Sequence, residues 1–260
     1  MVSIAGWIAD STPARTIRLG IAIALLILCP AWQIHAEEPT GNCQAWSNAL
    51  EFHPALPATR HALREGAALT LVALGSSTTE GAGANAQDES YPAEIGEQLE
   101  RRLPDHRIII LNEGIGGQTA YEMLQRMDED VIARRPTLLI WDTVITDTLR
   151  DVGQARLART LRKGIGKARE AGIDILLMDM QWLPHEDRYP NYDDYRKTFR
   201  KTAAELGVAV IPRYDLMKIM ARSEMFALPD QSGTDVLQLT DSSNHCLAIL
   251  VSEAIAGEQR

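Results

Sequence analysis

Two segments of the sequence carry residue types that can perform chemistry on a carbonyl compound. Ser77 ends a Gly-Ser-Ser turn that directly follows an apolar run, residues 69–74. A serine hydroxyl attacks a carbonyl carbon when a neighbouring base takes its proton. A glycine-rich stretch, residues 112–118, supplies backbone N–H groups that can hold an anion or an oxyanion. The alternative for Ser77 is a Ser/Thr-rich turn with no chemical role.

The elements that must position these segments alternate along the chain. Short apolar runs are separated by stretches of helical periodicity, which is typical of βαβ units with a parallel sheet. We predict strands at residues 69–74, 107–111, 137–141, 173–178 and 208–211. We predict helices at residues 58–64, 91–103, 118–135, 152–171, 192–206, 215–223 and 245–258. The predicted fold class is a flavodoxin-like, three-layer α/β/α domain with a five-stranded parallel sheet.

Loops that follow parallel strands open at one edge of the sheet, where ligands of open α/β sheets bind. Four such loops are expected, at residues 75–81, 112–118, 142–147 and 179–185. The glycine loop is not a P-loop, because no Gly-Lys-Ser/Thr follows it. Its glycine spacing is also wrong for a dinucleotide-binding fingerprint. We therefore predict no nucleotide cofactor and no other cofactor.

Composition and the chain ends indicate where the protein works. The formal charge is −9, from 26 Lys and Arg against 35 Asp and Glu, and an acidic surface argues against nucleic acid as a partner. Residues 1–36 have the order of a secretory signal: basic, apolar, then a small residue at the cut. The alternative is an N-terminal anchor, although the apolar stretch is short for a span of about 20 residues. We expect a secreted or periplasmic protein with no stable membrane span after signal cleavage.

We predict three segments: a signal peptide (1–36), an N-terminal extension laid over the domain (37–68) and the α/β domain (69–260). Removal of the signal leaves Cys43 and Cys246 near opposite ends of the chain. In an oxidising compartment such a pair favours a disulfide. The alternative is two unrelated buried thiols.

From residue 69 to residue 255 the chain resembles the SGNH/GDSL hydrolases, which are serine esterases on a flavodoxin-like sheet. The Gly-Ser-Ser turn stands where the family has Gly-Asp-Ser, and the family's Asn-x-Gly-x-x-Gly block is intact at residues 112–117. The resemblance implies that Ser77 is the nucleophile and that Ser77 and Gly117 donate backbone N–H groups to the oxyanion. Where the family has Gly-Thr-Asn, the chain has Val144, Ile145 and Thr146. The asparagine donor is therefore replaced by Thr146.

The family's last block, Asp-x-x-His, has two possible placements. Aligning the C-terminal helix without gaps places the block at Asp235 and Gln238, so that glutamine replaces the catalytic histidine. The other placement uses Asp241 and His245, but its spacing is one residue too long and puts His245 inside the helix. We favour the first placement.

Two hypotheses follow, because glutamine accepts a hydrogen bond but cannot hold a proton. Loss of the base in a serine hydrolase lowers kcat by on the order of 10⁶. In the first hypothesis, the protein is a cell-envelope esterase acting on a small-molecule or glycan ester, with His245 or His185 as a substitute base. In the second, it is an inactive protein of the same fold that binds an acylated envelope ligand. A histidine nitrogen within hydrogen-bonding reach of the Ser77 hydroxyl favours the first.

Other polar residues have simpler explanations. Asp179 and Gln181 either line the substrate entrance or simply end a strand. Asp147 and Arg150 are candidates for a local ion pair. Three further histidines lack the spacing of metal ligands, so we predict no metal site; they are His53, His61 and His106.

Overall fold

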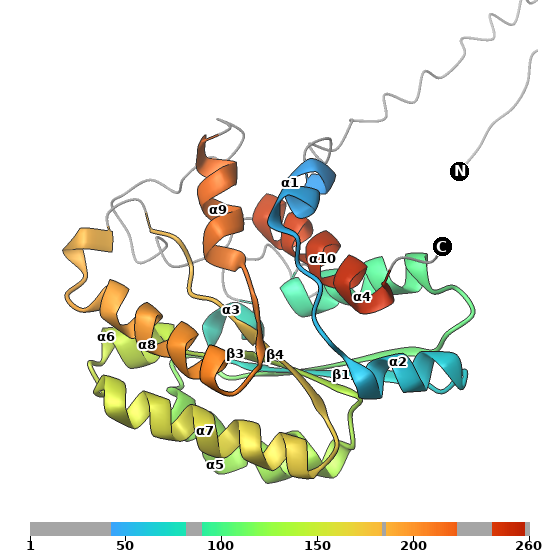
Figure 1. Cartoon of the computed structure of the whole chain (residues 1–260), viewed down its shortest axis with the longest axis horizontal. Helices are drawn as coiled ribbons and strands as arrows, with labels where there is room; N and C mark the ends of the chain where they lie inside the picture. Colours follow the sequence, from blue (N-terminus) through green and yellow to red (C-terminus); the bar gives the residue numbers. More distant parts are fainter. Residues whose placement is uncertain (1–42, 82–89, 184–185, 223–240, 258–260) are drawn as a thin grey trace, which may run out of the picture. The chain divides into compact units, whose positions relative to one another are not determined.

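A computed structural model describes residues 43–81, 90–183, 186–222 and 241–257 of the 260-residue chain. Among these residues, five parallel strands form one sheet in the order β2-β1-β3-β4-β5 (Figure 1). The strands are β1 (Leu69–Gly75), β2 (Ile108–Gly114), β3 (Leu138–Asp142), β4 (Asp174–Met178) and β5 (Ala209–Ile211). This order confirms the predicted flavodoxin-like fold class.

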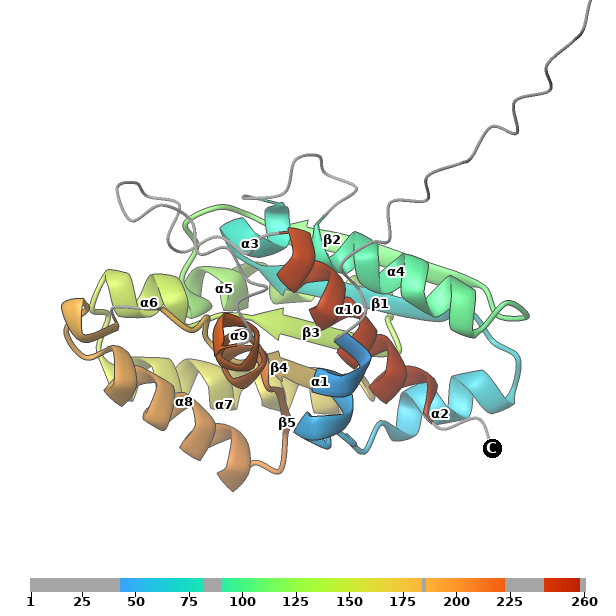
Figure 2. The same ribbon diagram turned by 90° about the horizontal axis from the view of Figure 1, so that it is seen from above.

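The sheet is buried because helices cover both of its faces, and its central strands are almost wholly apolar as a result. On one face lie α1 (Cys43–Leu50), α4 (Tyr91–Arg102), α9 (Arg213–Arg222) and α10 (Asp241–Ala256). The opposite face carries α5 (Ala120–Asp130), α7 (Gln154–Glu170) and α8 (Tyr192–Glu205). Figures 1 and 2 show these two layers, with α2 (Pro57–Arg64) beside them. Successive side chains of β1, such as Leu71 and Val72, enter opposite cores.

The bounds of two predicted helices differ most from those in the structure, and the other helices agree within two residues at each end. The helix expected at 118–135 begins only at Ala120, because Thr119 and Glu122 form a reciprocal capping box at its N-terminus. It ends at Asp130 and is followed by a short 3₁₀ turn, Ile132–Arg134. The C-terminal helix begins at Asp241, four residues before the predicted start.

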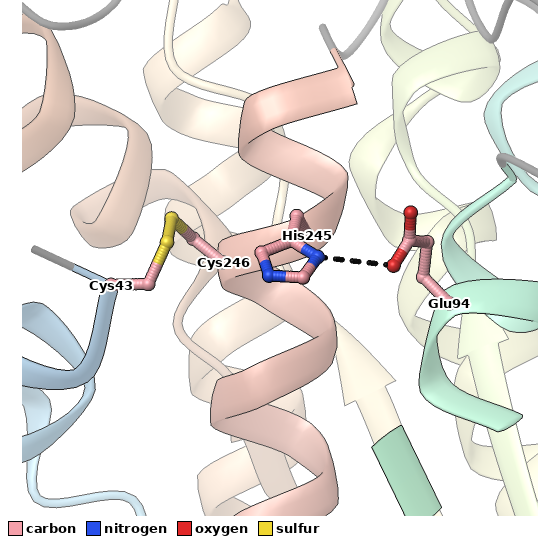
Figure 3. The surroundings of a disulfide bond; sticks show 4 residues. All are labelled: Cys43, Glu94, His245 and Cys246. Carbon is pink, nitrogen blue, oxygen red and sulfur yellow. Dashed lines mark hydrogen bonds and ion pairs between the residues drawn. A yellow bond between two sulfur atoms is a disulfide. The ribbon is translucent and has the colours of Figure 1, made fainter. Parts of the chain in front are cut away.

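A disulfide joins Cys43 of α1 to Cys246 of α10, with their Cα atoms 4.9 Å apart (Figure 3). It confirms the predicted pairing. Trp46 of α1 and Leu56 of the following loop lie in the same core as α10. Glu253 of α10 adds a polar link, since it accepts from Ser47 and pairs with Arg102 of α4. The disulfide-linked α1 therefore packs as part of the α/β body.

The predicted signal peptide lies outside the described residues. Within the described ranges, no helix is both long and apolar enough to cross a membrane.

Candidate active site

Ser77 stands at the carboxyl edge of the sheet, at the first residue of a one-turn helix, α3 (Ser77–Glu80), that follows β1 directly. The turn is tight enough to require glycine at its start. A Cβ on Gly75 would lie 1.9 Å from Thr79 Oγ1 and 3.1 Å from Asp142 Cβ. Gly81 ends the turn in the left-handed region, with φ of 117°. Ser77 itself is half-buried, whereas Thr78 and Thr79 are buried.

A buried ion pair contacts the turn that carries Ser77, residues 75–81. Asp142, the last residue of β3, pairs with Arg213 of α9 at 2.9 Å, and both side chains are 1% exposed. The carboxylate also accepts from Thr78 Oγ1 at 2.7 Å and from Thr79 Oγ1 at 3.3 Å. Thr79 Oγ1 lies 3.0 Å from the hydroxyl of Tyr91 on α4. The turn that carries Ser77 is thus fixed to β3, α4 and α9 by buried hydrogen bonds.

The glycine loop after β2 lies directly beside this turn. Gly75 and Gly114 are partners in the β1–β2 register, and Ile115 N donates to Gly75 O at 3.0 Å. A Cβ on Gly114 would lie 2.1 Å from Glu80 N, so only glycine allows the two backbones to meet. A Cβ on Gly116 would lie 4.0 Å from Ser77 Cβ.

Asn112 links the glycine loop to the turn of Ser77, because its Nδ2 donates to Thr79 O at 2.7 Å. Gly117 has a φ of 74°, a conformation that favours glycine. The structure therefore brings together the turn of Ser77 and the loop of Gly117, as the sequence predicted.

The loop after β3 departs from this pattern. Val144 has a φ of 86° and a ψ of −42°, an unfavourable conformation for a β-branched residue. Its side chain is 1% exposed and packs in the core between the sheet and α5. Thr146 follows in α6 (Ile145–Leu149) and is 9% exposed. The loop after β3 therefore holds a buried aliphatic side chain on a strained backbone.

Asp147 stabilises the start of α5, because its carboxylate accepts from Ala120 N at 2.8 Å. Burial raises the pKa of Asp147 to about 6, and the hydrogen bond from Ala120 N opposes that rise. Arg150 pairs with Glu122 at 3.5 Å. The predicted Asp147–Arg150 ion pair is therefore wrong: the two side chains take separate partners on α5.

The loop after β4 has a structural anchor. Asp179 is fully buried and pairs with Arg196 and Arg200 of α8 at 2.9 Å each. Its backbone oxygen accepts from Arg213 Nε at 2.9 Å. Gln181 is 1% exposed, and neither of its amide atoms has a hydrogen-bond partner among the described residues. These contacts favour a strand-end role for Asp179, and the proposed substrate-facing role of Gln181 stays a prediction.

The remaining predicted site residues are distributed unevenly. Asp235, Gln238 and His185 lie outside the described residues. His245 lies in the second turn of α10, and its Nδ1 is 3.2 Å from Glu94 Oε2 of α4 (Figure 3). The expectation that His245 falls inside the helix is confirmed.

None of the histidines in the described ranges makes a hydrogen bond with Ser77 Oγ. His106 Nε2 instead lies 3.0 Å from Leu63 O, and His245 pairs with Glu94. The same ranges hold no group of three or more metal-ligating side chains. The described site therefore contains Ser77 and a glycine loop but no histidine hydrogen-bonded to Ser77.

Sequence reasoning missed Asp142, Arg213 and Glu80. Asp142 and Arg213 are 71 residues apart, and no local pattern indicates that they meet. Glu80 follows Ser77 by three residues, and a Cβ on Gly116 would lie 2.7 Å from its Oε2. Its proximity to the glycine loop depends on how two loops meet at the sheet edge.

Comparison with known proteins identifies the family of this chain. The sequence model of the Non-GDSL lipase-like family matches residues 42–259. The chain belongs to this family. Because the match begins at residue 42, it includes the disulfide-linked α1 as well as the α/β body.

Relatives and solved structures share the arrangement at low identity. Esterase TesA of Pseudomonas aeruginosa is 26% identical over 150 residues, which cover 57% of this chain and 72% of TesA. The acetylxylan esterase Axe2 of Geobacillus stearothermophilus has a TM-score of 0.61 at 20% identity, covering 73% of this chain and 95% of Axe2. The esterase EstA of Pseudoalteromonas sp. has a TM-score of 0.58 at 18% identity, covering 72% and 96% of the two chains. At these identities the structural matches show a common SGNH-type fold.

Proposed function

We propose that this member of the Non-GDSL lipase-like family is an SGNH-type ester hydrolase with Ser77 as the nucleophile, and that its turnover is slow. The observation that carries the proposal is the junction of the Ser77 turn and the glycine loop. A carbonyl attacked by Ser77 Oγ would have the backbone N–H groups of Ser77 and Gly117 as oxyanion donors. Three features support this arrangement: the close approach at Gly114, the positive φ of Gly117 and the buried hydrogen bond from Thr78 to Asp142.

Slow turnover follows from the proposed loss of the general base. Gln238 stands at the position of the general base, and a glutamine amide cannot carry the proton that leaves Ser77. An oxyanion hole without its base still leaves about 10³- to 10⁴-fold acceleration over water. The Glu94–His245 contact gives no support to His245 as a substitute base.

The ester is proposed to sit on a small molecule or a glycan. Support comes from the names of structural neighbours: Axe2 is an acetylxylan esterase, and another neighbour is a two-domain esterase active on acetylated mannans. We also propose a secreted or periplasmic location. The Cys43–Cys246 disulfide supports it, since disulfides persist in oxidising compartments.

The test is hydrolysis of p-nitrophenyl acetate by the mature protein, by Ser77→Ala and by Gln238→His. The proposal expects weak wild-type activity that disappears in Ser77→Ala and rises by several orders of magnitude in Gln238→His. Activity that is equal in wild type and Ser77→Ala contradicts it. The matched control is Ser47→Ala, because Ser47 lies in α1, donates to Glu253 and belongs to neither loop of the site.

A second candidate is a non-catalytic protein that binds an acylated ligand at the same edge. The conformation of Val144 favours it, because a buried β-branched side chain on a strained backbone occupies the family's glycine position. This candidate predicts that no Ser77-dependent hydrolysis occurs, while Ser77→Ala and wild type bind an acylated sugar equally well. Calorimetric titration with an acetylated xylooligosaccharide measures the difference.

A further inference from the structure

A cavity of about 750 Å³ lies between α1, the loop that follows α1, α2 and the C-terminal ends of α4 and α10. This volume falls within the range of small-molecule binding sites, about 300–1,000 Å³. The disulfide that joins α1 to α10 holds one wall of the cavity against the other (Figure 3). The loops around Ser77 contribute nothing to its lining.

The cavity and Ser77 lie at opposite ends of α4. Tyr91 is the first residue of α4, and its hydroxyl lies 3.0 Å from Thr79 Oγ1 in the turn of Ser77. Arg102 is the last residue of the same helix and lines the cavity. A 12-residue helix is about 18 Å long, at 1.5 Å per residue. A ligand in the cavity therefore does not occupy the site of Ser77.

The charged side chains of the cavity walls are fixed by contacts with α10. Arg102 Nη2 pairs with Glu253 Oε1 at 3.1 Å. Arg60 of α2 donates from Nη1 to Ile255 O at 2.9 Å and from Nη2 to Ala254 O at 3.0 Å. These contacts hold both guanidinium groups in place before any ligand binds.

The charges that line the cavity cancel one another. Among the described residues of the lining, Glu51 and Glu253 are acidic, and Arg60 and Arg102 are basic. With His53 counted as neutral, these four charges sum to zero. The lining therefore gives neither a cation nor an anion a net electrostatic attraction.

The lining instead combines hydrogen-bonding groups with apolar surface. Gln44 Nε2 donates to Asn48 Oδ1 at 3.2 Å, so Gln44 Oε1 remains as an acceptor and Asn48 Nδ2 as a donor. A guanidinium carries five N–H donors, and Arg60 uses two of them at the end of α10. Phe52 and Leu250 add apolar surface. Such a lining fits an uncharged ligand that both donates and accepts hydrogen bonds and also has apolar faces.

We propose that this cavity is a second, non-catalytic site, which binds a neutral oligosaccharide. Sugar hydroxyl groups both donate and accept hydrogen bonds, and the C–H faces of a sugar ring pack on apolar side chains. The inference does not depend on hydrolysis at Ser77, because the two sites lie at opposite ends of α4. With a glycan ester as substrate, the second site would keep the protein on the polymer between reactions.

The test titrates three unesterified neutral sugars, xylotriose, mannotriose and cellotriose, into the mature protein. NMR follows the side-chain amides of Gln44 and Asn48 in the cavity and the backbone amides of Gly116 and Gly117 beside Ser77. We expect at least one sugar to cause a saturable shift at Gln44 and Asn48 and no shift at the two glycines. Its affinity should be equal at low and high salt, because the ligand carries no charge.

A pair of matched variants assigns the binding to the cavity. Asn48→Ala should weaken it about fivefold, as for the loss of one hydrogen bond, with the Gln44 side chain as the reporter. Gln125→Ala is the control, because Gln125 is an exposed amide on α5, in the opposite layer. Asn48 is also an exposed helical residue, so neither change should disturb the fold.

The inference is overturned if none of the three sugars shifts Gln44 and Asn48 at concentrations up to about 10 mM, beyond the range of weak binding. It is also overturned if the shifts appear only at Gly116 and Gly117, or if Asn48→Ala binds as tightly as Gln125→Ala. Tighter binding of anionic trigalacturonic acid than of every neutral sugar, lost at high salt, contradicts the assignment to a neutral ligand.

The proposed hydrolysis fails by a different measurement, the p-nitrophenyl acetate assay. Ser77→Ala abolishes the proposed hydrolysis but should bind the neutral sugar as tightly as wild type. A protein without Ser77-dependent turnover can therefore still show the second site, and an active esterase can lack it.

Discussion

The glycine loop after β2 and the loop after β3 both lie at the carboxyl edge of the sheet, where Ser77 stands, but their backbones differ. At Gly114 and Gly117 the first loop has glycine wherever close approach or a positive φ demands it. The second loop has Val144 at a φ of 86°, and it carries Thr146 at the position predicted to correspond to an asparagine donor. The Ser77 turn is also fixed by the buried Asp142–Arg213 pair at the end of β3, because Asp142 accepts from Thr78 and Thr79.

The comparison separates residues that stabilise this edge of the sheet from residues that are proposed to act in the reaction. Gly75 and Asp142 fix the turn of Ser77 through close approach and buried contacts, whether or not the protein turns over an ester. Thr146 and Gln238 are the positions at which the sequence alignment predicts a departure from the SGNH/GDSL pattern, and we propose that both act in the reaction. The junction of the Ser77 turn and the glycine loop therefore supports the proposed site, and the rate of turnover depends on the general base and on the third oxyanion donor.

The largest expected effect concerns the Asp142–Arg213 ion pair, which fixes the turn of Ser77. Asp142→Asn should lower the free energy of unfolding by about 3–5 kcal/mol, because it leaves the Arg213 charge buried without its partner. Urea denaturation measures the change. The double variant Asp142→Leu with Arg213→Met should recover most of the loss. A decrease below about 1 kcal/mol for Asp142→Asn, on the scale of an exposed ion pair, contradicts this assignment.

The next effect concerns Thr146, in the loop after β3. In the Gln238→His background, Thr146→Asn should raise kcat for p-nitrophenyl acetate by about 10²- to 10³-fold, the contribution of one oxyanion donor. KM should change little, because the bond strengthens mainly in the transition state. Thr148→Asn, in the same short helix, is the matched control. An equal kcat with and without the Thr146 substitution means that the loop cannot deliver a donor.

A pH-dependent effect follows from Asp147, which joins the two loops through Ala120. Its pKa of about 6 in the folded protein exceeds the value of 3.8 expected when unfolded, so the folded state binds more protons between these values. Its contribution to stability is therefore fully present below about pH 4 and is lost as the pH rises through 6. At about 1.4 kcal/mol per pKa unit, the loss is about 3 kcal/mol.

Asp147→Asn removes this titration while keeping an oxygen that can accept from Ala120 N. Thermal unfolding of wild type and variant should therefore converge near pH 4 and separate toward pH 7, with the variant the more stable. Parallel curves over this range contradict the assignment.

The smallest effect is expected at Val144. Glycine there relieves backbone strain of about 1–3 kcal/mol, but it also loses a buried side chain that contributes about 1.5–3 kcal/mol. The two changes nearly cancel, so Val144→Gly should alter the free energy of unfolding by less than about 1 kcal/mol. Val144→Ala keeps the strain and loses part of the burial, so it should be the more destabilising of the two. The reverse order shows that packing, and not the backbone, dominates at this position.

Local patterns were sufficient for the five strands and for most of the helices, although they did not predict α1, α3 or α6. The apolar run of β1 and the glycine that ends it locate Ser77, and the glycine block after β2 locates Gly117. The capping box at Thr119 and Glu122 is also a readable signal, and it explains why α5 starts later than its periodicity suggested. The disulfide was predicted from the two cysteines that remain when residues 1–36 are taken as a secretory signal.

The rest depends on long-range geometry. Nothing local connects Asp142 with Arg213, and the position of Glu80 depends on the approach of two loops. Valine rarely adopts a positive φ, so the conformation of Val144 has no signal in the sequence. The roles of Asp235 and Gln238 stay predictions, since both lie outside the described residues.

The disulfide sets an order for the protein's biogenesis. Its cysteines are 203 residues apart, and all five strands lie between them. At a synthesis rate of about 5–20 residues per second, Cys43 emerges about 10–40 seconds before Cys246. During that interval its native partner does not yet exist, and the chain can already have assembled its sheet. The covalent bond therefore closes late, joining α1 to a body whose strands were synthesised earlier.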